Sequence, residues 1–275
     1  MTLSPNGQRG IQSIEVGGQL LLALAHQGRP LALKDLAHEA GMAPAKAHPY
    51  LVSFGKLGLI EQDPANGRYG LGPLAVQLGL ISLQQLDPVA LATPVIETLA
   101  VQCGHTVAVA VWGNRGATIV RIAQPPAAVH VTMRHGTVMS LRGTASGRLF
   151  AAWLPRATVL QALRDEARAT GRARAGARAA NADFDAALDE IRRRGCSQVQ
   201  DLLLPGIGAI AAPVFDGSGA IVLALTAIGP TALLEAAAGD AVAAMLRAAA
   251  NGLSTRLGRR AESPNGGGPA AASAG

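Results

Sequence analysis

The chain has 275 residues, of which 49 % are hydrophobic, 15 % are charged and two are cysteines. This composition can bury a core, so it excludes a wholly disordered chain and a scaffold held by disulfides. The net charge of +6 is concentrated in residues 148–194, where ten basic groups face six acidic ones, so charge alone supports nucleic-acid binding only weakly. No apolar run reaches the roughly 18 residues of a membrane span, and the N-terminus lacks the apolar segment of a secretion signal. We expect a soluble, globular, cytoplasmic protein that does not contact a membrane.

Three short helices and a hairpin are predicted in residues 10–72, after a tail of residues 1–9 that is expected to be disordered. Apolar residues at helical spacing and glycine stop signals predict the helices, and Ser13 is the expected N-cap of the first one. The predicted elements are helices 13–26 and 33–40, a helix from Pro44 that ends at Gly58, and strands 59–62 and 68–71 around a Pro-Ala-Asn-Gly turn. This order is typical of a winged helix-turn-helix domain.

Residues 73–86 predict a helix that begins at Pro73 and is apolar on more than one face. A helix of this kind needs a cover, which is either a second copy of itself or the next domain, and we expect a linker helix that mediates dimerisation. Asp87 and Pro88 are typical of an N-cap and a first helical position, and they predict a further helix as far as Gln102.

Residues 87–260 are predicted to form an α+β domain on an antiparallel sheet, because strands of period two alternate with amphipathic helices and hairpin turns. A loop is expected at 172–180, where we interpret the arginines as solvated, with contact to DNA or RNA polymerase as the alternative. A second disordered tail is expected at 261–275. The predicted elements are strands 106–112, 117–122 and 129–133, helices 145–154 and 156–169, a helix closed by Gly195, strands 196–200, 207–215 and 220–228, and a C-terminal helix with Val242, Leu246 and Leu253.

The order of these segments and their motifs resembles the IclR family of bacterial transcriptional regulators, from about Gln12 to Gly258. The matching segments are residues 12–14 (QSI), 33–37 (LKDLA), 40–42 (AGM), 67–73 (GRYGLGP), 143–148 (GTASGR), Gly206, 211–214 (AAPV) and 228–230 (IGP). The resemblance implies an N-terminal winged helix-turn-helix that binds duplex DNA, a linker helix, and a C-terminal GAF-like α+β domain that binds a small effector. It also implies homodimers that often pair into tetramers.

The predicted recognition helix departs from the pattern of the family that it resembles. Pro49 stands at the usual Arg position and Ala45 and Lys46 at the usual Ser/Thr positions. The face opposite Ala47 and Leu51 is poor in the Arg, Asn and Gln that read base edges, and Pro49 is expected to kink the helix. We predict DNA binding nonetheless, with a degenerate winged helix that makes only protein contacts as the alternative. The predicted DNA-binding residues are Lys46, His48, Ser53, Lys56 and Arg68.

An effector pocket is expected around residues 144–146, where small residues at a helix start offer amide N–H groups to a carboxylate or phosphate. The other positions that match the family's pocket are mostly apolar, so we expect an aromatic or branched aliphatic acid rather than a small oxo-acid. Arg142 and Arg148 flank the loop as candidate charges. The alternative is that the apolar positions only pack in the core. The predicted effector-binding residues are Val131, Met139, Thr144, Ala145, Ser146, Val199, Ala209, Thr226 and Ile228.

Enzymatic, metal and cofactor sites are not expected. Ser146 lies one position late for a G-x-S-x-G nucleophile elbow, and no ordered acid and histidine follow it. Cys103 with His105, and His130 with His135, lack the further ligands of a metal site. We predict a DNA-binding transcriptional regulator that controls a catabolic operon and responds to a small organic acid. The alternative is a ligand-binding or scaffolding protein whose winged helix mediates protein contacts.

Overall fold

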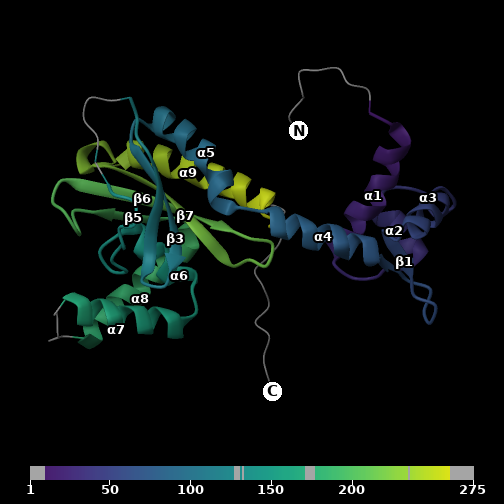
Figure 1. Cartoon of the computed structure of the whole chain (residues 1–275), viewed down its shortest axis with the longest axis horizontal. Helices are drawn as coiled ribbons and strands as arrows, with labels where there is room; N and C mark the ends of the chain where they lie inside the picture. The colour runs from purple at the N-terminus through teal and green to yellow at the C-terminus, as the bar shows by residue number, and fades with distance from the viewer. Residues whose placement is uncertain (1–9, 127–130, 132, 171–176, 235, 261–275) are drawn as a thin grey trace. The chain divides into compact units, whose positions relative to one another are not determined.

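The computed structural model describes residues 10–126, 131, 133–170, 177–234 and 236–260. The chain divides into two compact units, Met1–Leu86 and Asp87–Gly275. Each unit has a hydrophobic core of its own. In Figure 1 the first unit runs from purple to blue, and the second continues through teal and green to yellow.

The N-terminal unit is a three-helix domain with a two-stranded hairpin. Its elements are α1 (Gln12–Gln27), α2 (Leu33–Glu39), α3 (Pro44–Leu57), β1 (Ile60–Gln62), β2 (Tyr69–Leu71) and α4 (Pro73–Gln85). The apolar stripes of the first three helices pack together, and Leu20, Leu36 and Leu51 are at most 2 % exposed. The two strands pair antiparallel. The unit therefore has the predicted winged helix-turn-helix order.

The helix ends of this unit confirm some turn signals and correct others. α1 and α3 stop at Gly28 and Gly58, whose φ values of 66° and 74° suit glycine. Ser13 is not the N-cap of α1, because the helix begins before it and Ile11 holds that position without a side-chain hydrogen bond. α3 continues through Pro49 to its end, so the missing N–H of the proline does not terminate the helix.

The linker helix α4 contributes no buried side chain to the unit among those that the structure describes. Its large apolar residues Val76, Leu78, Leu80 and Ile81 are between 42 % and 59 % exposed. The N-terminal unit by itself therefore leaves this helix uncovered.

The C-terminal unit is built on a five-stranded antiparallel sheet of order β4-β3-β7-β6-β5. Its elements are α5 (Pro88–Cys103), β3 (Thr106–Gly113), β4 (Gly116–Ala123), α6 (Ala145–Trp153), α7 (Arg156–Thr170), α8 (Ala177–Arg194), β5 (Ser197–Gln200), β6 (Ile207–Phe215), β7 (Ile221–Pro230), a 3₁₀ turn (Thr231–Leu233) and α9 (Ala236–Arg256). Asp87 caps α5 as predicted, because its carboxylate accepts from the amides of Val89 and Ala90. The predicted α+β class on an antiparallel sheet is confirmed.

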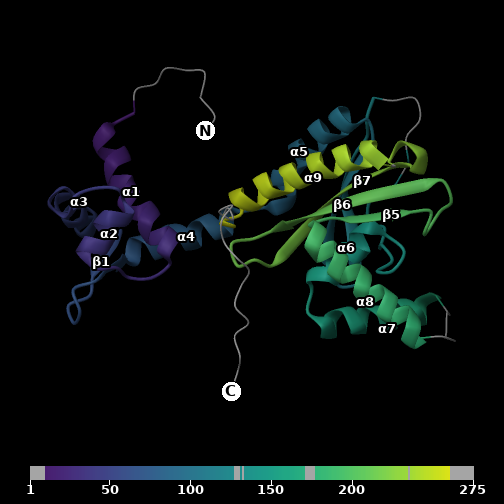
Figure 2. The ribbon, with the colours of Figure 1, turned by 180° about the vertical axis from the view of Figure 1, so that it is seen from behind.

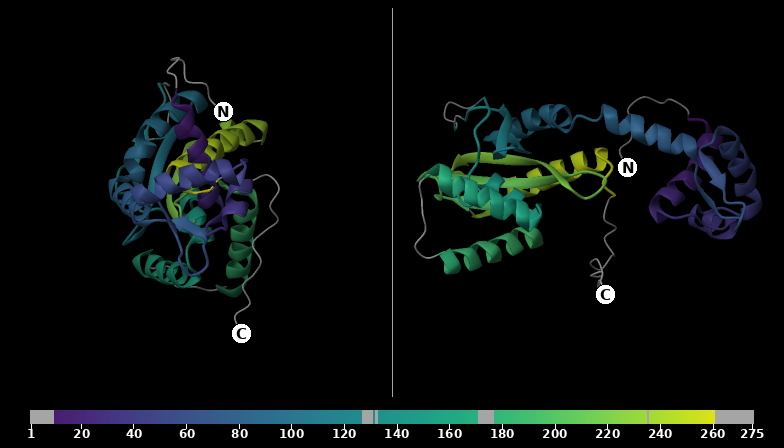
Figure 3. Two further views of the ribbon diagram at one scale, coloured as in Figure 1. Left: turned by 90° about the vertical axis from the view of Figure 1, so that its right-hand side faces the viewer. Right: turned by 60° about the horizontal axis from the view of Figure 1, so that its bottom comes forward.

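Helices cover both faces of this sheet. α5 and α9 pack on one face, and α6 packs on the other with α7 and α8 beyond it. Figure 2 shows this layering from behind, and the right-hand view of Figure 3 shows α7 and α8 as a separate outer layer. The central strands are consequently buried on both faces, and Val107, Val109, Leu223 and Leu225 are fully buried.

The third strand predicted at 129–133 is not formed by the residues that the structure describes there. Val131 and Met133 belong to no strand, and residues 127–130 and 132 lie outside the described part of the chain. Thr106 donates its hydroxyl to the carbonyl oxygen of Val131 at 2.9 Å. A side-chain hydrogen bond therefore connects Val131 to the start of β3. The alternating pattern alone predicts backbone hydrogen bonds between paired strands there.

The loop predicted at 172–180 is wrong at its end, because α8 begins at Ala177. Arg and Ala are strong helix formers, and their propensity outweighs the loop signal of the glycines before them. Residues 171–176 lie outside the described residues, as do both predicted tails, 1–9 and 261–275.

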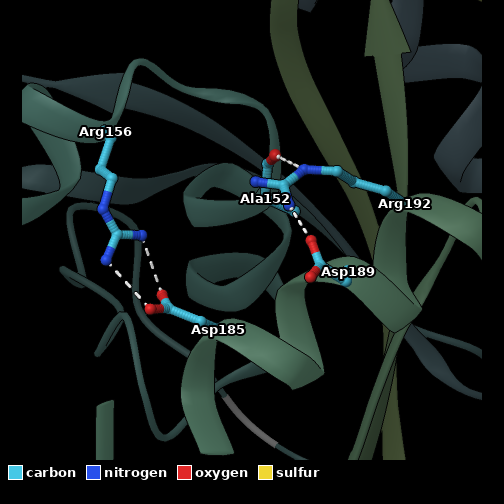
Figure 4. A network of polar contacts seen from close by, with 5 residues as sticks. All are labelled: Ala152, Arg156, Asp185, Asp189 and Arg192. Atoms are coloured by element: carbon cyan, nitrogen blue, oxygen red, sulfur yellow. Dashed lines mark hydrogen bonds and ion pairs between the residues drawn. The ribbon is translucent and has the colours of Figure 1, made fainter. Parts of the chain in front are cut away.

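Ion pairs and a main-chain contact join the three helices below the sheet (Figure 4). Arg156 at the start of α7 makes two parallel hydrogen bonds of 3.0 and 2.9 Å to Asp185 of α8, and these bonds lower the pKa of the Asp185 carboxyl. Arg192 of α8 donates to the carbonyl oxygen of Ala152 in α6 at 2.6 Å and pairs with Asp189 at 2.5 Å. The network aligns α7 and α8 with α6, although its exposed pairs contribute little stability singly.

Candidate functional site

The predicted DNA-binding residues lie on exposed surface of the N-terminal unit. Lys46, His48, Ser53 and Lys56 are exposed along α3, while Ala47 and Leu51 on the opposite side are buried. The helix therefore presents the predicted face outwards. Ser53 donates its hydroxyl to the carbonyl oxygen of Pro49 at 2.9 Å, so that proton is already used within the helix.

Arg68 lies in the turn between β1 and β2, which forms the wing. Asp63 shapes this turn, since its carboxylate accepts from the amide of Ala65 and from the side chain of Asn66. The amide of Arg68 donates to the Asn66 side chain at 3.0 Å, and its guanidinium-bearing side chain is exposed. The wing thus offers one cation beside the two lysines of α3, in a unit that has few base-reading side chains on its exposed helix face.

All nine predicted effector-binding residues line one cavity of about 490 Å³ in the C-terminal unit, which we name the effector cavity. They come from the segment before α6, from the start of α6, and from β5, β6 and β7. The cavity size falls in the range of small-molecule sites. The structure brings these residues together as the resemblance implies: Val131, Met139, Thr144, Ala145, Ser146, Val199, Ala209, Thr226 and Ile228.

The start of α6 forms the polar end of this cavity. Thr144 caps the helix: its hydroxyl accepts from the amide of Gly147 at 3.1 Å and donates to the carbonyl oxygen of Ser140 at 2.7 Å. Gly147 packs so closely on this segment that a Cβ would collide with the Ser140 backbone. Within the described residues, no hydrogen bond uses the amides of Ala145 and Ser146. These two N–H groups can therefore receive a carboxylate.

Two buried hydroxyls add to this polar end. The Ser146 and Thr226 side-chain oxygens are 2.9 Å apart, and both residues are at most 1 % exposed. Val199 and Ile228 belong to the hydrophobic core and also line the cavity. The two predictions for the apolar positions, core packing and pocket lining, are thus compatible at these residues.

The charged residue of the effector cavity is one that the sequence argument missed. Arg134 lines the cavity, whereas Arg142 and Arg148 do not. The Arg142 guanidinium lies 4.4 Å from the ring centre of Phe184, and Arg148 donates to the carbonyl oxygen of Arg142 at 2.7 Å. Burial lowers the pKa of Arg148. No spacing rule marks Arg134, because it reaches the cavity from an irregular segment.

The loop after β5 is the second feature that the sequence argument missed. Leu202, Leu203 and Leu204 line the effector cavity and are each at least half exposed. Asp201 closes the loop by accepting from the amide of Gly206 at 2.6 Å and from the hydroxyl of Thr231 at 3.0 Å. A run of three leucines before Pro-Gly signals an unusual loop, and it extends the apolar wall of the cavity.

The candidate metal ligands do not form a site within the described residues. No group of three or more His, Cys, Asp and Glu side chains gathers there, and His130 lies outside them. His105 is buried, and burial lowers its pKa. Ser146 has Thr226 as its partner rather than a histidine. No helix in the described parts of the chain has the length and apolar character needed to span a bilayer.

Comparisons with known proteins show the family to which both units are similar. Two family models match, the IclR helix-turn-helix domain over residues 13–64 and the bacterial transcriptional regulator IclR C-terminal domain over residues 81–255. A glycerol operon regulatory protein of Streptomyces griseus is 33 % identical over 222 residues, which cover 81 % of this chain and 86 % of that protein. The HTH-type transcriptional regulator XynR of Escherichia coli strain K12 is 27 % identical over 217 residues, 78 % of this chain and 85 % of that protein.

Among solved structures, the crystal structure of Pseudomonas aeruginosa HmgR matches with a TM-score of 0.81 and 36 % identity, over 90 % of this chain and 99 % of that one. The similarity therefore extends over both units. Since the C-terminal family model alone matches more than half of the sequence and the helix-turn-helix model matches the first unit, the chain belongs to the IclR family of bacterial transcriptional regulators.

Proposed function

We propose that this IclR-type regulator controls a catabolic operon by binding duplex DNA through α3 and the wing, and that a mostly apolar organic acid in the effector cavity modulates the binding. The observation that carries the proposal is the effector cavity, where a helix start meets apolar walls. Binding to the chromosome would place the activity in the cytoplasm. Relatives named for operon control, such as the glycerol operon regulatory protein, support the catabolic assignment.

The proposed DNA-binding surface of the protein combines the winged-helix shape with a modest positive charge. Lys46, Lys56 and Arg68 are exposed on the two elements that a winged helix applies to a duplex, and His48 and Ser53 lie between them. Three cations neutralise few phosphates, so we expect weak binding by one copy and stronger binding by a dimer that reads two half-sites.

The DNA proposal can be tested by gel shift against the DNA upstream of the protein's own gene and of its neighbours. The double variant Lys46→Ala with Arg68→Ala should bind more weakly, with a salt slope flatter by about one unit per lost phosphate contact. Arg164→Ala with Arg168→Ala removes the same charge from exposed α7 and should bind like the wild type. Equal affinity of both double variants would move the DNA surface elsewhere. Absence of any binding would favour the alternative of a scaffolding protein.

The effector proposal rests on the two ends of the cavity. The amides of Ala145 and Ser146 and the side chain of Arg134 favour an anion, while Val199 and Ile228 belong to its apolar wall. A small oxo-acid would leave its further oxygens against apolar atoms, at a cost of about 1–3 kcal/mol each. An aromatic or branched aliphatic carboxylate satisfies both ends.

A thermal-shift panel of glyoxylate, pyruvate, benzoate and longer aromatic acids tests this proposal. Aromatic acids should raise the Tm of the C-terminal unit, and Arg134→Gln should weaken them about two- to fivefold. Arg121→Gln, at an exposed position of β4, serves as the matched control. Stabilisation by glyoxylate or pyruvate alone would contradict the apolar assignment, and no stabilisation by any acid would leave core packing as the role of these residues.

We also propose that α4 mediates a homodimer, since its exposed leucines, valine and isoleucine have no cover within the N-terminal unit. Leu78→Glu should shift the protein to a monomer in light scattering, and Gln77→Glu on the same exposed helix should not. A Leu78→Glu protein that stays fully dimeric would rule out α4 as the main contact. Pairing of dimers into tetramers stays a prediction, and contact of the arginines at 172–178 with RNA polymerase or DNA stays the alternative to a solvated loop.

A further inference from the structure

A second cavity lies beside the effector cavity in the C-terminal unit. This hollow of about 930 Å³, which we name the α7 cavity, is lined by the β3–β4 turn, by residues 138–141 and by one face of α7. Its volume is in the range of small-molecule sites. Val138, Met139 and Ser140 line both cavities, so the two sites share one wall.

The charge of the two linings is opposite. The effector cavity has Arg134 as its charged side chain and no acidic residue among its lining residues. The α7 cavity has Asp165 and Glu166 from α7, against Arg115 from the exposed turn between β3 and β4. A charged ligand that suits one lining is therefore disfavoured by the other.

The two carboxylates have different partners in the fold. Glu166 accepts from the amide of Leu141 at 3.1 Å and thereby connects α7 to the residue that follows the shared wall. Asp165 accepts from Gln161 at 3.0 Å and pairs with Arg168 at 3.3 Å, and both of these partners are exposed on its own helix. A carboxylate has more acceptor sites than these exposed contacts of Asp165 occupy, so Asp165 can also receive an N–H donor of a ligand.

An aromatic side chain lines the same cavity as these carboxylates. Trp112, at the end of β3, lines the α7 cavity and is only partly buried, with its ring 5.8 Å from that of Phe150. An indole ring attracts a cation over its face, and Met139 and Leu141 extend the apolar surface beside it. Carboxylates, an indole and apolar side chains together are complementary to an amine with an apolar body.

We propose that the α7 cavity is a second ligand site, which takes an organic cation consisting of an ammonium group on an aromatic or apolar body. Asp165 receives the ammonium group, Glu166 adds a second negative charge next to it, and Trp112 packs against the body. The site is separate from the effector cavity in both charge and lining, apart from the shared wall.

The chain provides its own reporter for this site, because it has two tryptophans and one of them lines the cavity. Trp153 packs against Phe215 at 5.5 Å and lines neither cavity. In a full-length Trp153→Phe protein the emission comes from Trp112. Titration with phenethylamine should change this emission saturably, while the neutral 2-phenylethanol and the anionic 3-phenylpropanoate should bind the reporter site at least about fivefold more weakly.

Charge variants in the same Trp153→Phe background locate the ammonium group. Asp165→Asn should weaken phenethylamine about two- to fivefold, and Glu166→Gln should add to the loss. Asp240→Asn, exposed on α9 at the other face of the sheet, is the matched control and should leave the affinity unchanged. Because Glu166 also holds Leu141, Asp165→Asn is the deciding variant, and its unchanged Tm would exclude a folding defect.

Three results would overturn the proposal. They are no saturable change of Trp112 emission with phenethylamine, equal affinity for phenethylamine and 2-phenylethanol, and wild-type affinity in the Asp165→Asn protein. None of these measurements involves DNA or an acid effector, so the outcome is independent of the function proposed above.

Discussion

In the N-terminal unit, the residues proposed to bind DNA are exposed side chains on two neighbouring segments, α3 and the wing. In the C-terminal unit, the residues around the effector cavity come from segments spread between Val131 and Ile228, and several of them are fully buried. The proposed DNA-binding site therefore lies on the surface of its unit, outside the small hydrophobic core. The second site is part of the packing of its unit.

This difference has an energetic consequence. A surface residue of α3 can change with little effect on folding, because water replaces the contacts that it loses. Ser146 lines the cavity and is fully buried, and Gly147 next to it packs against the backbone of Ser140, so a substitution at Ser146 changes stability and binding together. The following predictions test whether substitutions in the two units differ in this way in their effects on stability.

The largest effect is expected from Leu51→Ala in the N-terminal unit. Leu51 is 2 % exposed in the three-helix core, so its truncation should destabilise that unit by about 2–5 kcal/mol. Val52→Ala, the next residue and 44 % exposed, should cost less than about 0.5 kcal/mol. Differential scanning calorimetry should show the transition of the C-terminal unit unmoved by Leu51→Ala. A matching shift of both transitions would show that the units do not unfold separately.

A smaller loss is expected from Gly147→Ala in α6. The new Cβ would meet the backbone of Ser140 and Leu141, so the start of the helix must shift, at a cost of about 1–3 kcal/mol. Gly252→Ala in α9 meets nothing within 4 Å, and it should instead stabilise the unit by about 0.5–1 kcal/mol. Denaturant titration of both variants measures the contrast. Equal effects of the two substitutions would contradict the close packing at Gly147.

The buried pair of hydroxyls gives a third test. Ser146→Ala leaves the Thr226 hydroxyl without its 2.9 Å partner and should cost about 1 kcal/mol of unfolding free energy. Adding Thr226→Val removes the orphaned hydroxyl as well, so the double variant should recover much of that loss. Urea unfolding of the wild type, both single variants and the double variant, all without ligand, measures this double-mutant cycle. Strictly additive losses of unfolding free energy would mean that the two hydroxyls do not interact.

The smallest effect is a dependence of stability on pH. Burial lowers the pKa of His105 from its ordinary 6.5, so the unfolded chain takes up a proton more readily than the folded unit. The stability that comes from the neutral His105 is fully present above pH 6.5. It is lost as the pH falls from 6.5 through the lower pKa of the folded state. The Tm of the C-terminal unit should fall from pH 7.5 to 5.5, and less so in His105→Gln. The exposed His135→Gln should retain the wild-type dependence, and equal slopes in both variants would assign it to other groups.

The sequence by itself determined the elements with strong local signals. Leucine spacing, glycines at helix ends and the Asp87-Pro88 start predicted the helices of both units within a few residues, because these signals act through neighbours along the chain. The resemblance to a known family added the order of the domains and the nine pocket positions. It missed Arg134 and Leu202–Leu204, since these lie on irregular segments that no periodicity marks.

Tertiary structure alone decided which side chains meet. Ser146 contacts Thr226, 80 residues further along the chain, and Glu166 in α7 accepts from the amide of Leu141, 25 residues earlier. The tertiary structure also places the Arg142 guanidinium against the ring of Phe184. Arg142 does not line the cavity, although in sequence it lies next to the loop that does. Such contacts depend on the packing of whole helices against the sheet, and that packing satisfies all the long-range contacts at once, so no local pattern specifies any one of them.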